Sequence, residues 1–206
     1  MASMIRSRCS TPLILAIVCF STMIRAAEPF EFDSPKNWRA ERIAFPLGFA
    51  PELKHSGFEE LRFAPGMFNP KSNTYWTYVF FWWIEGEVTI DRTQMERDLK
   101  NYYLGLSKTV GRSRKLVIDP EKISAQLKPA KDQPAKESAP IFTGTLKTYD
   151  AFATGDLLEL NVEISKRYFP DLKRTCYFFA LSPKPISAPA WTEMRAIRNS
   201  FKIRKP

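Results

Sequence analysis

The chain has 206 residues, of which 44% are hydrophobic and 26% charged, and its formal net charge is +9. This composition excludes a wholly disordered protein, because disordered chains lack this much apolar and aromatic content. One histidine and three cysteines exclude zinc-finger arrays and disulfide-rich scaffolds, and 16 prolines against 8 glycines exclude collagen-like repeats.

The first 27 residues have the order of a secretory signal peptide. Arg6 and Arg8 precede an apolar run over residues 12–20, and Ala26 and Ala27 supply small residues for cleavage. The run is too short for a bilayer span, which takes about 20 apolar residues. We therefore expect an exported protein, periplasmic or extracellular, with no transmembrane span after processing. An uncleaved membrane anchor is the alternative.

Cleavage would change both the charge and the cysteine count. It would remove three arginines and no acid, which lowers the formal charge from +9 to +6. It would also remove Cys9 and Cys19, so that Cys176 could form no intramolecular disulfide. We expect Cys176 to be a small buried hydrophobe, because it lies in a strand-like run. The remaining residues, 28–206, are enough for one domain with a single core.

Three strands are predicted in the first half of the chain. Residues 38–45 and 57–63 form two short strands, and Pro65-Gly66 is typical of a type II turn. The strongest strand pattern covers residues 74–84, where tyrosine, tryptophan and phenylalanine occupy both alternating faces. Such a strand is either central and covered on both sides, or covered on one side and free to bind a ligand on the other.

Two amphipathic helices are predicted. Asp91 is a typical N-cap, and apolar residues follow it at helical spacing as far as Gly111. The second helix begins near Ser187, with Pro189 in its first turn. The apolar faces consist of Met95, Leu99, Tyr102, Leu106 and Val110 in the first helix and Trp191, Met194, Ile197 and Phe201 in the second.

Between the helices the pattern is less regular. Residues 116–118 are predicted as a short strand. Residues 119–140 contain four prolines, four lysines and four acidic residues, which predicts a flexible loop. Strand patterns return over residues 142–146, 158–164 and 175–181, and the second of these alternates with polar residues that predict one solvent-exposed face.

The order of strands, helix, long loop, strands and helix indicates the α+β class. Because the strands occur in hairpin-like runs and do not alternate with helices, we predict a mainly antiparallel sheet packed by two amphipathic helices in a single domain.

The sequence contains no nucleotide-binding loop, zinc-protease motif or serine-hydrolase motif, so we predict no cofactor and no metal. The best local cluster is His55 and Ser56, followed by Glu59 and Glu60, which could support general acid–base chemistry. Adjacent glutamates in a strand point to opposite faces, however, and do not form a paired-carboxylate site. A structural loop histidine is the favoured interpretation.

The aromatic strand and the loop before it supply the candidate ligand site. Their rings could stack on a sugar or hold an acyl chain, although a role in the sheet core is the commoner use of such residues. The candidate binding residues are Met67, Phe68, Tyr75, Trp76, Tyr78, Trp82 and Trp83.

Basic residues gather after both predicted helices. Cations near a helix C-terminus are favourable in themselves, so these residues require no ligand. Lipid headgroups or another polyanion are the alternative partners, and no recognition motif indicates nucleic acid. The residues are Arg112, Arg114 and Lys115 after the first helix and Arg195, Arg198, Lys202, Arg204 and Lys205 in and after the second.

Two segments carry a resemblance to known proteins. Residues 43–51 and 57–68, followed by the aromatic strand, resemble exported bacterial proteins of uncharacterised function, and this resemblance implies no activity. The order of elements and the Ser200-Phe201 helix end are also loosely similar to the PsbP/Mog1-like fold, which implies architecture alone.

The sequence therefore favours an exported, non-enzymatic α+β protein that binds a small amphipathic ligand or an envelope partner. One alternative is a hydrolase that uses His55 with Glu59 or Glu60. Another is an accessory subunit of an envelope complex that docks through residues 119–140.

Overall fold

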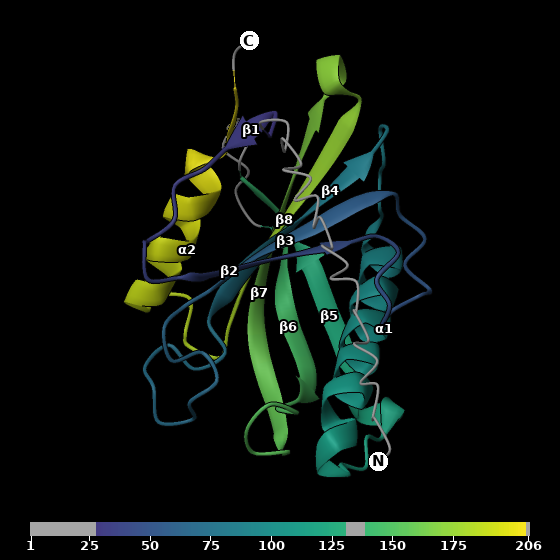
Figure 1. Cartoon of the computed structure of the whole chain (residues 1–206), viewed down its shortest axis with the longest axis vertical. Helices are drawn as coiled ribbons and strands as arrows, with labels where there is room; N and C mark the ends of the chain where they lie inside the picture. Colours follow the sequence, from purple (N-terminus) through teal and green to yellow (C-terminus); the bar gives the residue numbers. More distant parts are fainter. Residues whose placement is uncertain (1–27, 131–138, 205–206) are drawn as a thin grey trace, which may run out of the picture.

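An antiparallel sheet of seven strands forms the middle layer of the molecule, with one helix on each face (Figure 1). The computed structural model describes residues 28–130 and 139–204, and the predicted signal peptide lies outside them. In sheet order the strands are β2 (Arg39–Ala44), β3 (Gly57–Phe63), β4 (Tyr78–Glu85), β8 (Arg174–Ser182), β7 (Leu157–Phe169), β6 (Pro140–Tyr149) and β5 (Ser124–Pro129).

The remaining elements complete the three layers. Helix α1 (Arg92–Gly111) covers one face of the sheet and helix α2 (Pro189–Ser200) the other. A separate two-stranded ribbon joins β1 (Phe30–Glu31) to β9 (Lys202–Ile203). Short 3-10 turns are η1 (Arg112–Arg114), η2 (Pro120–Lys122) and η3 (Pro170–Leu172). The predicted α+β domain with two helices on an antiparallel sheet is confirmed.

Strand β4 is central and is buried on both faces, as its two-sided aromatic pattern predicts. It lies between β3 and β8. Phe80 and Trp82 face α1 and are fully buried, while Phe81 and Trp83 belong to the second core beneath α2. Phe80 also stacks on Phe179 of β8, with ring centroids 4.4 Å apart. The aromatic strand thus supplies side chains to both cores.

The strand does not begin at residue 74, as the sequence pattern predicts. Residues 74–77 form a turn, and Trp76 has a left-handed backbone with φ of 49°. The amide of Trp76 donates to the carbonyl of Met67, and the amide of Thr77 donates to that of Thr74. These local hydrogen bonds outweigh the strand preference of the aromatic residues.

Helix α1 follows the predicted pattern. The Asp91 carboxylate accepts a hydrogen bond of 2.8 Å from the amide of Gln94, and Met95, Leu99 and Tyr102 are buried. Gly105 permits a close approach of the preceding loop, because a Cβ there would lie 1.8 Å from the carbonyl oxygen of Phe49.

The predicted flexible loop over residues 119–140 is wrong in its first half. Residues 124–129 form the edge strand β5, which pairs with β6. Leu127 is buried, and its amide donates to the Glu96 carboxylate of α1. Residues 131–138 lie outside the described residues. A deletion of residues 119–140 would therefore remove a sheet strand as well as a connection.

Two smaller expectations are corrected. Residues 116–118 form no strand, and Val117 is 90% exposed. The face of β7 predicted to be solvated is covered at Glu163, because α2 brings Arg195 and Arg198 onto its carboxylate.

Among the described residues, no helix combines the length and hydrophobicity needed to cross a membrane.

We predict that Gly105→Ala destabilises the protein by about 1–3 kcal/mol, because the new methyl group collides with backbone and not with a movable side chain. In an open helix the same change stabilises by about 1 kcal/mol, so the sign of the effect identifies the close approach. Gly48→Ala is the control, since nothing lies within 4 Å of its added Cβ. Urea unfolding of both variants measures the free energies, and a stabilised Gly105→Ala would contradict the packing.

Candidate functional site

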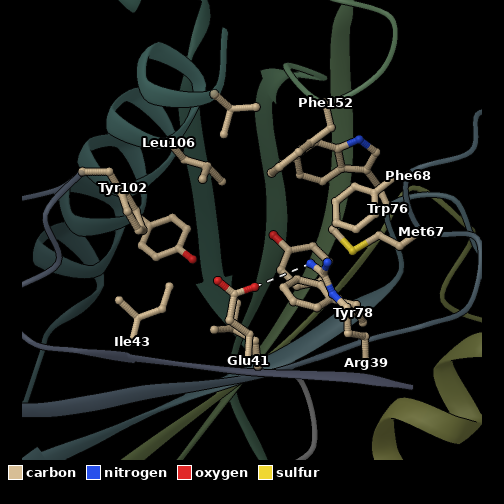
Figure 2. A pocket seen from close by; sticks show the side chains of 14 residues that line it. Arg39, Glu41, Ile43, Met67, Phe68, Trp76, Tyr78, Tyr102, Leu106 and Phe152 are labelled. Carbon is tan, nitrogen blue, oxygen red and sulfur yellow. Dashed lines mark ion pairs between the residues drawn. The ribbon is translucent and has the colours of Figure 1, made fainter. Parts of the chain in front are cut away.

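A pocket of about 210 Å³ lies between α1, the inward face of β2 and β3, and the loop over residues 64–77 (Figure 2). Side chains from these three sides point toward one another, with Tyr102 and Leu106 opposite Met67 and Trp76. The full lining is Arg39, Glu41, Ile43, Phe49, Leu61, Phe63, Met67, Phe68, Trp76, Tyr78, Tyr102, Leu106, Val110 and Phe152.

The sheet wall is built by alternation along two neighbouring strands. Arg39 of β2 pairs with Phe63 of β3, and Glu41 pairs with Leu61, so all four residues face the same side of the sheet. Because β2 is the edge strand, its inward positions are only partly covered. Charged residues stand there in place of the apolar ones that would close the layer.

The helix wall comes from the C-terminal half of α1. Tyr102, Leu106 and Val110 follow one another at steps of four and therefore share a face. The ring of Phe49 packs edge-on against Tyr102, with centroids 5.0 Å apart. Since Gly105 lets the Phe49 backbone lie against the helix, this wall depends on a glycine at that position.

The loop wall is rigidly organised. Pro65-Gly66 forms the predicted type II turn, in which Gly66 has φ of 78° and the amide of Met67 donates to the carbonyl of Ala64. The next ring, Phe68, contacts Phe152 from the turn between β6 and β7, with centroids 4.9 Å apart. Two loops that are far apart in sequence therefore close the pocket together.

An ion pair stands beside this apolar surface. The guanidinium of Arg39 lies 3.5 Å from the Glu41 carboxylate, and the two side chains are 62% and 45% exposed. The guanidinium also lies over the rings of Phe63 and Phe68, at 4.9 and 5.3 Å from their centroids. These contacts hold a positive charge where the apolar wall meets solvent.

Asp150 joins the two loops that close the pocket. Its buried carboxylate accepts hydrogen bonds from the Tyr75 hydroxyl at 2.6 Å, from Trp76 Nε1 at 3.1 Å, and from the amides of Ala153 and Thr154. Burial alone would raise the pKa of Asp150, but these donors lower it below its usual range. The orientation of the Trp76 ring in the pocket wall is thus set by a charged group behind it.

A second buried carboxyl lies behind the helix wall. Glu59 is fully buried and accepts hydrogen bonds of 3.2 Å from Trp82 Nε1 and from the Tyr102 hydroxyl. Burial raises the pKa of Glu59 to about 8, although both hydrogen bonds favour the charged form. At neutral pH the carboxyl is therefore mostly protonated and supports Tyr102 as a neutral group.

The structure brings together four of the seven predicted ligand residues. Met67, Phe68, Trp76 and Tyr78 line the pocket. The other three have structural positions: Trp82 and Trp83 are buried in the two cores, and Tyr75 donates its hydroxyl proton to Asp150.

In the described part of the chain, no hydrogen bond or ion pair joins His55 to Glu59 or to Glu60, the two carboxyls of the hydrolase alternative. The buried Nε2 of His55 has no hydrogen-bond partner, and its ring lies against Phe45 and Trp82. Burial lowers the pKa of His55, and the charge of Asp98 opposes that shift. Glu59 faces α1, where it accepts hydrogen bonds from Trp82 and Tyr102. Glu60 faces the other side of the sheet, where it accepts from Arg42 and Arg62.

Most of the pocket lining was not among the predicted site residues. Tyr102, Leu106 and Val110 of α1 were predicted as core residues, and only the structure shows that they border a pocket. For Arg39 and Glu41 a signal existed, because they alternate with Ile43 on one face of β2, and their own partners on β3, Phe63 and Leu61, are apolar.

The pocket lining that the structure describes contains no serine, cysteine, histidine or lysine, and its ionisable side chains are Arg39, Glu41, Tyr78 and Tyr102. The described residues also contain no group of three or more histidine, cysteine or carboxylate side chains able to hold a metal ion. The sequence matches no protein-family model and no curated protein.

We predict that Glu59→Gln stabilises the protein at high pH and has little effect at low pH. The folded-state pKa is raised, so stability is greatest below the ordinary value of 4.5 and is lost as the pH rises towards 8. The gain above pH 8 is at most about 5 kcal/mol, since each pKa unit corresponds to about 1.4 kcal/mol. Urea unfolding from pH 4 to 9 measures this, and a gain independent of pH would contradict a protonated Glu59.

We predict that Asp150→Asn destabilises the protein by about 2–3 kcal/mol at pH 7, because an amide cannot accept from all four donors. The folded-state pKa is lowered, so the contribution of Asp150 exists above its ordinary value of 3.8 and is lost as the pH falls through the folded-state pKa. The difference from the wild type should therefore shrink in acid. Asp156→Asn, at an exposed position of the same turn, is the control for thermal unfolding at pH 7 and pH 3.

Proposed function

We propose that the protein is an exported, non-enzymatic binding protein that holds a small amphipathic molecule in the pocket beside α1. The observation that carries this proposal is the combination of an aromatic and aliphatic lining with a single ion pair, Arg39–Glu41, at its edge. Ligand pockets commonly combine an apolar surface with a few polar groups that orient the bound molecule.

The volume limits the size of the bound apolar group. A dry protein cavity of about 150 Å³ holds one benzene molecule, and drug-sized ligands occupy about 300–1,000 Å³. A pocket of about 210 Å³ therefore accepts a single substituted ring or a short acyl chain. A more open hollow of about 400 Å³ shares Arg39, Phe63, Met67 and Phe68 with it, so a longer ligand could continue past the ion pair.

The charges indicate how such a ligand is oriented. Its apolar part packs between Leu106 and Met67, and its polar head lies beside Arg39 and Glu41. An anionic head replaces Glu41 as the partner of Arg39, and a cationic head replaces Arg39 as the partner of Glu41. Both exchanges conserve the number of ion pairs, so burial of the apolar part provides the affinity.

The test compares two probes of similar shape and opposite charge, octanoate and octylammonium. The full chain is expressed in an exporting host, and the N-terminus of the recovered protein is determined by intact mass. Native mass spectrometry then detects any co-purified ligand, and calorimetric titration measures binding of each probe. We expect saturable binding of at least one probe with a stoichiometry of one.

Two matched variants locate the binding. Leu106→Trp fills the pocket and should weaken binding at least tenfold, because the added ring occupies the ligand volume. Thr109→Trp adds the same ring to an exposed position of α1 and should leave binding unchanged. The proposal fails if neither probe binds, or if both tryptophan variants bind as the wild type does.

A further inference from the structure

Three chain segments meet at one end of the molecule, at the bottom of Figure 1: the C-terminus of α1, the segment that follows it, and the turn between β6 and β7. Arg114 Nη1 donates to the carbonyl of Ala151 at 3.2 Å, and the amide of Asp119 donates to the Tyr149 hydroxyl at 3.4 Å. We call the exposed residues here the basic tip: Lys108, Arg112, Arg114, Lys115, Val117, Phe152 and Leu157.

The basic tip carries more positive than negative charge: against its four cations stands one exposed acidic residue in the turn between β6 and β7, Asp156. Residues 108–118 contain four cations and no acidic residue. In the part of the chain that the structure describes, none of these four cations forms an ion pair. Elsewhere the arginines of β2, β3 and α2 pair with carboxylates, as Arg42, Arg62 and Arg195 do. With Asp156 counted, the tip thus carries three positive charges in excess of its negative charge.

Apolar side chains protrude among these cations. Four large apolar residues are exposed in the described part of the chain, and three of them belong to the tip. Val117 is 90% exposed, Leu157 52% and Phe152 36%. Leu116 next to Val117 points inward and lies close to Gly155. The segment therefore turns one side chain onto the protein and the next one into solvent.

The helix dipole does not explain this arrangement fully. It favours cations in the last turn of a helix and weakens beyond that turn. It therefore accounts for Lys108 and in part for Arg112, but not for Lys115 and not for an exposed valine. Amphipathic helices that lie in the headgroup region of a membrane combine inserted apolar side chains with lysine and arginine, and the tip combines the same two features on loops.

We propose that the basic tip docks the protein onto a bilayer that carries anionic headgroups, with Val117, Leu157 and Phe152 inserted at the interface. The shape favours lipid over an acidic protein partner. A stable protein interface buries about 800 Å² of well-packed surface on each side, whereas this tip offers three separate side chains on two loops. Lysine and arginine interact with an anionic surface without a shaped partner.

Membrane docking by the tip is compatible with ligand binding in the pocket but does not depend on it. Phe152 belongs both to the tip and to the pocket lining, and Val110 lines the pocket between Lys108 and Arg112 of the tip. Docking would therefore bring one wall of the pocket to the lipid surface, where short acyl chains and other amphiphiles are concentrated. The tip would still bind lipid if the pocket were empty.

The experiment is co-sedimentation with vesicles of phosphatidylcholine alone or with phosphatidylglycerol added. The chain is expressed in full, and all variants carry the same N-terminus, so any leader contributes equally. We expect binding to the anionic vesicles, release at high salt, and much weaker binding to phosphatidylcholine. Each cation near the membrane contributes about fivefold in affinity, so Arg112→Glu with Lys115→Glu should lower binding on the order of 100-fold.

Matched variants separate the tip from net charge. Lys54→Glu with Lys173→Glu changes the total charge equally at exposed positions away from the tip and should reduce binding far less. Val117→Asp should weaken binding at least tenfold without changing thermal unfolding, since the side chain is 90% exposed. Ile186→Asp is the apolar control at another exposed site.

Three results would overturn the proposal. The first is an absence of binding to anionic vesicles at low salt. The second is an equal loss of binding in both charge-reversed pairs, which would show that net charge alone is responsible. The third is an affinity of Val117→Asp for anionic vesicles equal to that of the wild type. This would show that Val117 does not insert and that the tip attracts polyanions by charge alone. Octanoate titration of the tip variants without vesicles tests the pocket separately, so the two proposals can fail independently.

Discussion

The burial of β4 on both faces is the constraint on which the rest of the structure depends. A strand with aromatic residues on each side exposes apolar surface unless a layer covers both faces. In this protein α1 and its neighbouring loops cover Phe80 and Trp82, and α2 with the terminal ribbon covers Phe81 and Trp83. The position of β4 between β3 and β8 then fixes where the sheet edges fall. The pocket lies toward one of those edges, where the covering layer is incomplete.

The two faces close in different ways, and the difference explains why one of them carries the candidate site. Beneath α2 the carboxylate of Glu163 is held by Arg195 and Arg198, so a buried charge is matched by two cations from the helix above it. Beneath α1 the inward positions of the edge strand are Arg39 and Glu41, which remain in solvent. Inward charges on an edge strand also oppose pairing with other chains. The same residues therefore leave a pocket open and protect the edge.

The sequence predicted the fold more fully than the site, for physical reasons. Alternation and helical spacing report burial, and they correctly placed β3, both helices and the two-sided β4. They failed at residues 74–77, where hydrogen bonds to the carbonyls of Thr74 and Met67 form a turn, and at residues 124–129, where pairing with the distant strand β6 decides the conformation. A pocket is an absence of packing, and no periodicity distinguishes Leu106 beside a cavity from Leu99 in the core. Four of the seven predicted binding residues line the pocket, because the same aromatic cluster supplies side chains to the core and to the pocket wall.

Asp150 connects the stability of the site to its shape. A carboxylate with four donors is among the strongest local arrangements in a protein, since each charge-assisted hydrogen bond is about twice as strong as a neutral one. One pair of its donors lies in the turn that presents Trp76, and the other lies in the turn that carries Phe152. Both turns are loops, which would otherwise move relative to the sheet. Because a single buried charge accepts hydrogen bonds from both turns, it fixes the Trp76 and Phe152 sides of the pocket wall relative to one another.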